Sequence, residues 1–151
     1  MSLEKDIQQE VFRNSYQKAA VNIIFSANWL NEQMKTYLQE DEVTPQQYNI
    51  LRILRGSKKP LSTLQIRARM LDRMSDTSRI VDRLIKKGWV QKNICRADKR
   101  LVDVLITEEG LALLEKLDQN NHLIDATLAN LNAQEIDQLN VLLDKIREKR
   151  S

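Results

Sequence analysis

The sequence predicts a mainly α-helical domain of about six helices with one small β-hairpin. The 151 residues include only three glycines and two prolines, so few positions interrupt long helices. Ser, Thr or Asn followed three residues later by Gln or Glu, a pattern that begins helices, recurs along the chain. Two short runs rich in β-branched and aromatic residues lie next to each other, at about residues 89–95 and 100–106. We expect a single domain over residues 1–151.

The first predicted helix covers about residues 5–39. At roughly 1.5 Å per residue it would extend about 50 Å, which is more than the width of a small domain. An apolar face on such a peripheral helix needs a surface to pack against. Its apolar residues include Val11, Phe12, Ile23, Ile24, Phe25, Trp29, Leu30 and Met34.

Three shorter helices follow, and we expect them at residues 45–55, 62–71 and 75–87. Each begins at a residue that can cap a helix, namely Thr44, Ser62 and Ser75. The first two caps have Gln three residues later and form capping boxes. Gly56 and Gly88 are expected to end the first and third of these helices.

The hairpin joins the two β-rich runs through the short polar stretch "RADK". A two-stranded hairpin alone is marginally stable in water, so we expect it to lean on the helices. Two further helices complete the chain, from Thr107 to about residue 129 and over about residues 133–149.

The last predicted helix repeats apolar residues on one face, at Ile136, Leu139, Leu143 and Ile146. This face, like that of the first helix, either packs on its own chain or meets a second copy. A two-fold dimer is the economical solution. It would place residues 1–39 and 108–151 in dimerisation helices and residues 40–107 in a separate lobe.

Positive charge is concentrated in the middle of the chain. Residues 67–100 hold eleven Lys or Arg against four acids, a net charge of +7, while the remainder carries −4. Such asymmetry suits a polyanionic partner at one face, but a solvated charged surface explains it equally well.

The helix at 75–87, its two predecessors and the hairpin together form a helix-turn-helix with a wing. Ile80, Val81, Leu84 and Ile85 share the spacing of one buried face. The other side is polar and basic, which suits a DNA major groove. It is expected to hold Thr77, Ser78, Arg79, Asp82, Arg83, Lys86 and Lys87.

The stretches "SRIVDRLIKKGWVQK" and "RADKRLVDVLITEEG" resemble the MarR family of bacterial transcriptional regulators. The resemblance implies a winged helix-turn-helix homodimer that binds double-stranded DNA at a pseudo-palindromic operator, usually as a repressor. It also implies release from DNA by a small ligand in many members. It places Ser75, Thr77, Ser78 and Arg79 on the recognition helix, and it has Asp98 orient Arg100 in the wing.

We therefore predict DNA contacts from Arg73, Ser75, Thr77, Ser78, Arg79, Arg83, Arg96, Lys99 and Arg100. Further positive charge comes from Arg67, Arg69 and Lys92. Asp82 is expected to pair with Lys86 or Arg79. Members often have Leu-Gly before the recognition helix, whereas this chain has Leu71-Asp72-Arg73-Met74, where Asp72 is expected to tolerate a left-handed conformation. The alternative function is a winged-helix adaptor that binds protein and not DNA.

The sequence gives little support for catalysis, metal binding or a redox role. His122 and Cys95 are far apart, and we expect no enzyme activity, cofactor or metal site. Trp29, Tyr37 and Tyr48 are weak candidates for a ligand pocket and equally good core residues. Cys95 is expected to fill space, although neighbouring cations favour a reactive thiol. No apolar run is long enough to span a bilayer, and the N-terminal stretch lacks an apolar signal core. The single cysteine excludes an internal disulfide, so we expect a protein of the reducing cytoplasm.

Overall fold

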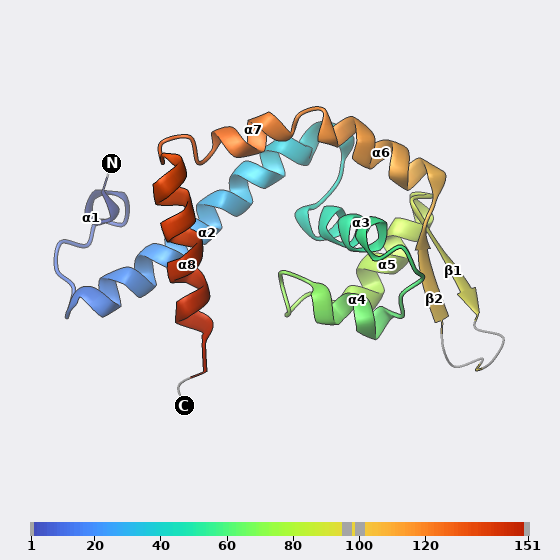
Figure 1. The fold of residues 1–151 in the computed structure, drawn as a ribbon, viewed down its shortest axis with the longest axis horizontal. Coiled ribbons are helices and arrows are strands. Elements are labelled where there is room, and N and C mark those ends of the chain that lie inside the picture. Colours follow the sequence, from blue (N-terminus) through green and yellow to red (C-terminus); the bar gives the residue numbers. More distant parts are fainter. Residues whose placement is uncertain (1, 95–97, 99–101, 150–151) are drawn as a thin grey trace.

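The computed structural model describes residues 2–94, 98 and 102–149. It is mainly α-helical with one antiparallel hairpin, as predicted (Figure 1). The N-terminal helices are α1 (Leu3–Asp6) and α2 (Ser15–Leu38), followed by the short 3-10 helix η1 (Gln39–Asp41). Next come α3 (Pro45–Ser57), α4 (Thr63–Arg69), α5 (Thr77–Lys86), β1 (Val90–Ile94) and β2 (Val102–Ile106). The last helices are α6 (Glu108–Asp118), α7 (Asn121–Ala126) and α8 (Ala133–Arg147).

The predicted extent of the first helix was wrong, because the helical conformation is interrupted between α1 and α2. Gln8 adopts a left-handed conformation with φ of 53°. Asn14 then caps α2, since its side chain accepts a hydrogen bond from the Gln17 backbone N–H at 2.9 Å. Val11 and Phe12 therefore lie in the connection and not on a helix. An ion pair between Glu4 of α1 and Lys18 of α2 joins the two helices.

Capping boxes begin α3 and α4 as predicted, with Thr44 and Ser62 as the caps. The expected stop at Gly56 was wrong, because α3 continues to Ser57 and Lys58 takes the left-handed position with φ of 56°. The predicted cap at Ser75 was also wrong. The Asp76 side chain accepts from the Arg79 backbone N–H at 3.2 Å, so α5 begins at Thr77.

Gly88 ends α5 as predicted, with φ of 79°. The backbone N–H groups of Gly88 and Trp89 donate to the carbonyls of Ile85 and Leu84, which is the Schellman arrangement. The chain thereby turns directly from α5 into β1. The reversal holds the hairpin next to the helix.

The two strands pair from Val90 opposite Ile106 to Ile94 opposite Val102. Leu61, just before α4, pairs with Val104 on the other side of β2 through hydrogen bonds of 3.1 and 2.8 Å. The prediction that the hairpin leans on other elements is confirmed. Strand β2 is therefore hydrogen-bonded on both edges, to β1 on one side and to Leu61 on the other.

The prediction of one continuous helix from Thr107 to residue 129 was wrong, because two separate helices cover this segment. Thr107 caps α6 by accepting from the Gly110 N–H at 3.1 Å, but α6 ends at Asp118 and α7 begins only at Asn121. The sequence Gln119-Asn120-Asn121 at the break is rich in Asn, a poor helix former. The capping box of α8, with Asn132 and Glu135, is confirmed.

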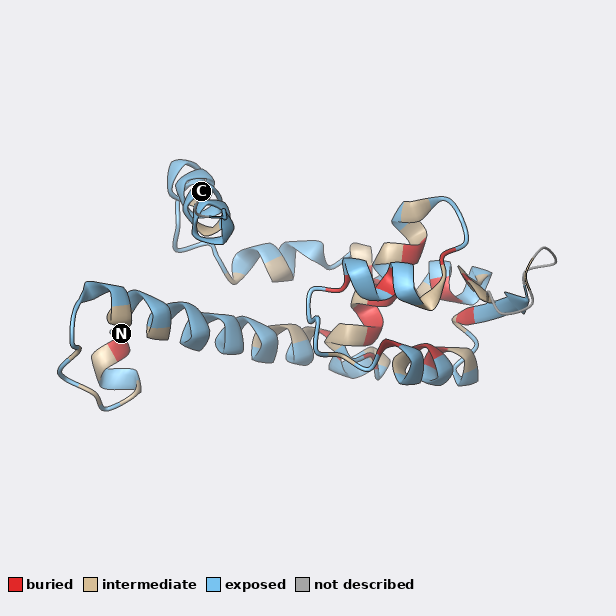
Figure 2. Ribbon diagram, turned by 90° about the horizontal axis from the view of Figure 1, so that it is seen from below, coloured by how far each residue is buried: buried red, intermediate tan, exposed pale blue. Residues whose placement is uncertain are grey.

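The core lies in what we call the central lobe, formed by α3, α4, α5 and the hairpin together with the adjoining ends of α2 and α6. Its completely buried side chains are Leu38, Ile50, Leu51, Ile66, Val81, Leu84, Val104 and Leu114. Figure 2 shows most of the buried residues gathered in this lobe, whereas most of α2 and all of α8 are exposed or only partly covered. Leu3 of α1 is buried outside the lobe. Within the described ranges, no helix has the length and apolarity needed to cross a membrane.

Candidate nucleic-acid interface

Helix α5 has one buried and one exposed face. Val81 and Leu84 are completely buried, and Ile80 and Ile85 pack against the same core, as predicted. The exposed face carries Ser78, Arg79, Asp82, Arg83 and Lys86. The buried face fixes the helix on the central lobe, and the other face is open to a partner.

The expected position of Thr77 on the exposed face was wrong. Its side chain is only 3% exposed, while Ser75 is half-buried. Their hydroxyl oxygens have no hydrogen-bond partner within the described residues. Thr77 precedes Val81 by four residues, so it shares the buried face, and the spacing alone would have shown this.

The expected partner of Asp82 was also wrong. Its carboxylate pairs with Lys92 of β1 at 2.7 Å and not with Lys86 or Arg79. Asp82 is the single acid on the exposed face of α5, and the hairpin neutralises it. Within the described part of the chain, Arg79, Arg83 and Lys86 enter no ion pair, so this face is positively charged.

The turn between α4 and α5 needs neither a glycine nor a left-handed residue. The predicted left-handed role of Asp72 was wrong, because it is not among the described residues with positive φ. The Asp72 carboxylate instead accepts from the Met74 N–H at 3.0 Å. The Leu71 N–H donates to the side-chain carbonyl of Asn49 on α3, also at 3.0 Å. Arg73 is exposed in this turn.

The remaining predicted contacts lie around the hairpin. Arg96, Lys99, Arg100 and Cys95 are outside the described residues, and Asp98 is described as half-buried. Three further cations, Arg67 and Arg69 of α4 and Lys92 of β1, are exposed. Cations from α4, the turn, α5 and the hairpin therefore belong to consecutive elements of one lobe (Figure 1).

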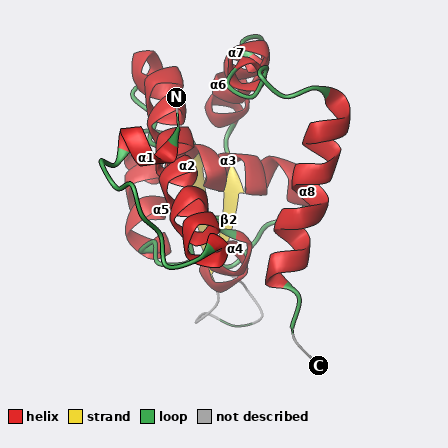
Figure 3. Ribbon diagram, turned by 90° about the vertical axis from the view of Figure 1, so that its left-hand side faces the viewer, coloured by secondary structure: helices red, strands yellow, loops and turns green. Residues whose placement is uncertain are grey.

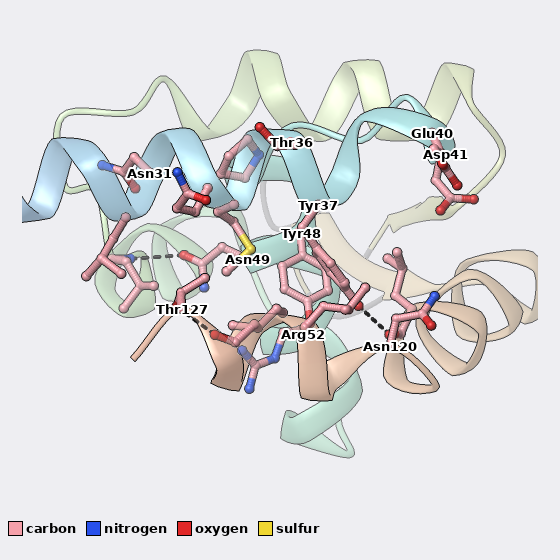
Figure 4. A pocket seen from close by; sticks show the side chains of 18 of the residues that line it. Asn31, Thr36, Tyr37, Glu40, Asp41, Tyr48, Asn49, Arg52, Asn120 and Thr127 are labelled. Atoms are coloured by element: carbon pink, nitrogen blue, oxygen red, sulfur yellow. Dashed lines mark hydrogen bonds between the residues drawn. The ribbon is translucent and has the colours of Figure 1, made fainter. Parts of the chain in front are cut away.

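A cavity of about 560 Å³ lies between α2, α3, α6 and α7. Tyr37 and Tyr48 both line it, whereas Trp29 lines a separate hollow beside α1. Tyr48 is also part of the core. Burial raises the pKa of the Tyr37 phenol, and its hydroxyl donates a hydrogen bond to the Leu117 carbonyl (Figure 4).

The cavity wall combines apolar side chains with a few charged ones. Lys116 and Asp41 neutralise each other at 2.5 Å, and their hydrogen bond raises the pKa of the Lys116 ammonium. Arg52 lies over the Tyr48 ring, 5.6 Å from its centre, and forms no ion pair within the described ranges. The wall therefore offers an aromatic surface beside an unneutralised guanidinium.

Comparisons with known proteins agree with this architecture. A model described as the MarR family matches residues 42–101. The multiple antibiotic resistance protein MarR of Salmonella typhimurium is 30% identical over 129 residues, which are 82% of this chain and 88% of that protein.

Several solved structures share the fold. A MarR mutant from E. coli complexed with operator DNA superposes with a TM-score of 0.82 at 25% identity, covering 92% of this chain and 100% of that one. An organohalide-sensing transcriptional regulator in its 2,4-dichlorophenol-bound form also has a TM-score of 0.82, at 18% identity, covering 92% of this chain and 85% of that one.

Proposed function

This chain belongs to the MarR family of DNA-binding transcriptional regulators, and we propose that it binds a pseudo-palindromic operator as a homodimer and represses transcription. The exposed face of α5 is the observation that carries this proposal. An α-helix with its side chains is about 10–12 Å across, and the major groove of B-DNA is about 12 Å wide. Arg79, Arg83 and Lys86 line one side of such a helix, while Val81 and Leu84 anchor the other.

The proposed contacts divide into base-reading and phosphate-binding groups. Ser78 and Arg79 lie in the first turn of α5, where a recognition helix approaches base edges, and Arg can bond guanine with two hydrogen bonds. Arg83, Lys86 and Arg73 are proposed to bind phosphates, which position the protein without reading sequence. We keep the wing residues Arg96, Lys99 and Arg100, with Asp98 as the orienting group, as proposed contacts.

The homodimer is supported by the apolar surface that the single chain leaves open. No residue of α8 is buried, and this helix stands away from the central lobe (Figures 1 and 2), to one side of α2 (Figure 3). On α2, Ile24 and Trp29 are 62% and 44% exposed, and on α8 Leu142 and Ile146 are 49% and 63% exposed. Apolar patches of this kind mark interaction sites, and a second copy would cover them with the symmetry of a palindromic operator.

We further propose that the cavity beside Tyr37 and Tyr48 binds a small aromatic weak acid. Its apolar wall includes Met34 and Ile124, and the Arg52 guanidinium would attract an anionic oxygen. A regulator of the same fold has been solved with a phenol bound. Trp29 is not part of this proposal, because it does not line the cavity.

Selection of bound sequences from random DNA duplexes tests the function directly. We expect an inverted repeat whose half-site centres are separated by about 10–10.5 base pairs or a multiple of it. A dimer that neutralises ~6–10 phosphates should also lose about 10³–10⁵ in affinity between roughly 50 and 200 mM salt. Enrichment of no sequence, together with a flat salt response, would favour the protein-binding adaptor instead.

A further inference from the structure

A shallow hollow of about 300 Å³ lies between the first part of α4 and the N-terminal end of α5. Two large apolar side chains line it, Leu64 in the first turn of α4 and Met74 in the turn before α5. Leu64 is 75% exposed, and Met74 is 93% exposed, more than any other large apolar side chain that the structure describes. The core of the single chain therefore leaves both side chains open to a partner.

The hollow is continuous with the face of α5 that we propose to bind DNA. Ser78 belongs to both, because it lines the hollow and is exposed in the first turn of α5. Figure 1 shows α4 on the side of the central lobe opposite α6, next to the turn that leads into α5. A duplex bound at the first turn of α5 would therefore cover Leu64 and Met74 as well.

The charges around the hollow favour a base edge over a phosphate group inside it. Arg67 lines the hollow, and Arg73 and Arg79 are close to it in the sequence. None of the three forms an ion pair within the described residues. The carboxylate of Asp76, which also lines the hollow and caps α5, would repel a phosphate placed there. DNA phosphates can thus meet the arginines, while the hollow meets an uncharged part of the duplex.

Thymine is the base whose major-groove edge matches this lining. It presents the O4 acceptor beside the C5-methyl group, and adenine, guanine and cytosine carry no methyl group on that edge. Leu64 and Met74 can pack around the methyl group from two sides. The exposed Ser78 hydroxyl can donate to O4.

We propose, on the basis of the function proposed above, that Leu64 and Met74 read one thymine in each operator half-site through its C5-methyl group. Both residues lie outside α5, so α4 and the turn would contribute to sequence preference together with the recognition helix. Burial of one methyl group changes an equilibrium constant about fourfold. A dimer that contacts one thymine in each half-site therefore gains about 15-fold in affinity.

The first test replaces thymidine by deoxyuridine, which lacks the methyl group and keeps the base pair. Each thymine of the selected operator is replaced in turn, at the same position of both half-sites, and affinity is measured by fluorescence anisotropy. We expect one position at which uracil weakens binding of the wild type about 15-fold. A selected half-site without thymine, or without a position sensitive to uracil, would overturn the proposal.

The second test combines the modified DNA with a variant that carries both Leu64→Ala and Met74→Ala. Both side chains are exposed, and Ala favours the helix at position 64, so the fold should be retained. The double variant should bind the thymine and uracil operators equally, with about the affinity of the wild type for the uracil operator.

Leu71→Ala is the matched control, because Leu71 is a similarly exposed apolar residue of the same turn that does not line the hollow. It should keep the full preference for thymine over uracil. If uracil instead weakens the double variant as much as the wild type, the methyl group acts through the shape of the DNA. That result refutes a direct contact.

A third measurement places 5-methylcytosine at the sensitive position, where it supplies the methyl group without O4. Compared with cytosine, 5-methylcytosine in both half-sites should raise the affinity of the wild type about 15-fold and leave that of the double variant unchanged. A preference for unmethylated cytosine would assign the hollow to the cytosine amino group, with Asp76 as the acceptor, and would contradict the proposal.

Failure of the proposed function gives a different pattern. If selection recovers no sequence, the regulator assignment fails and the thymine contact fails with it. If selection recovers an inverted repeat to which uracil makes no difference, the operator stands, and only the reading by Leu64 and Met74 is refuted.

Discussion

Gly110, in the first turn of α6, lies against the backbone between α5 and β1. A Cβ atom built at this position would be 2.4 Å from the Trp89 carbonyl oxygen and 2.7 Å from the Ile106 side chain. Side chains can move, but the carbonyl belongs to the backbone of the helix-to-strand reversal. Only glycine permits this approach of α6 to the base of the hairpin.

Gly110→Ala is accordingly expected to destabilise the protein by about 1–3 kcal/mol, the usual cost of overpacking. Gly56→Ala is the matched control, because Gly56 has no atom within 4 Å of the added Cβ and lies inside α3. This control should be neutral or up to ~1 kcal/mol more stable, since Ala favours helix over Gly. Urea denaturation distinguishes the two, and equal stability of both variants would contradict the close approach.

Arg79 supplies the residue-scale test of DNA reading. Arg79→Ala should lose about 1–3 kcal/mol of binding free energy per subunit and relax sequence preference at one position of each half-site. Lys86→Ala should instead weaken binding to all sequences similarly and lower the salt dependence by about one phosphate contact per subunit. Arg13→Ala, outside the central lobe, is the control for lost positive charge. Fluorescence anisotropy with selected and random duplexes would refute the assignment if Arg79→Ala affected both equally.

The partners of individual side chains were harder to predict from the sequence than the buried and exposed faces of helices. The buried side of α5 follows from residues at a 3.6-residue period. Val81 and Leu84 are completely buried, and Ile80 packs partly buried against the same core, which confirms the prediction. Asp82 pairs with Lys92, ten residues away on a strand, and a rule for neighbours on one helix cannot find such a partner. The hydrogen bond that the Asn49 side chain accepts could not be predicted from the sequence either, because its donor, the Leu71 N–H, lies 22 residues away in the turn after α4.

At the scale of elements, capping signals predicted the beginnings of helices better than periodicity predicted their lengths. Thr44, Ser62 and Asn132 each start a helix as expected. The break before α2 was missed although Asn14 is itself a cap, because apolar residues continue on both sides of it. Local signals for starting a helix should therefore outweigh an uninterrupted apolar pattern.

Helix α8 is expected to hold the dimer together through the row of Leu139, Leu142 and Ile146. Leu142→Glu would place an unpaired carboxylate in an apolar interface. The free-energy cost of burying this charge exceeds the gain from apolar contact at that position. Sedimentation velocity should show monomers at concentrations where the wild type is dimeric. Gln134→Glu adds the same charge to α8 outside this row and should leave the dimer intact. A Leu142→Glu protein that sediments as a dimer would remove α8 from the interface.

At the scale of the whole molecule, the buried core and the exposed apolar surface occupy different regions. The central lobe has a contiguous core. This core was predictable because the apolar faces of its short helices and strands can pack against one another within the chain. Most of α2 and all of α8 are exposed or only partly covered in the single chain. The apolar faces in the sequence favoured a second copy as the partner of these helices, but no local pattern encodes the packing angle between two copies.

The stability of such a molecule should depend on protein concentration. If folding of α2 and α8 is completed by a second copy, each tenfold rise in concentration adds about 1.4 kcal/mol of apparent stability per dimer. Calorimetry over a hundredfold concentration range should therefore show a rising Tm for the wild type and a much smaller rise for Leu142→Glu. A Tm independent of concentration in the wild type would argue for a self-sufficient monomer.

The pairing of Leu61 with Val104 bears on which parts of the chain can vary in length. Because Leu61 is bonded through both its N–H and its carbonyl to the inner strand, the connection from α3 to α4 is tied to the hairpin. An inserted residue between Lys58 and Leu61 would slip this pairing and carry the hairpin out of line with α4. Homologous chains should therefore keep this connection constant in length, and they should accept insertions more readily in the exposed segment between α7 and α8.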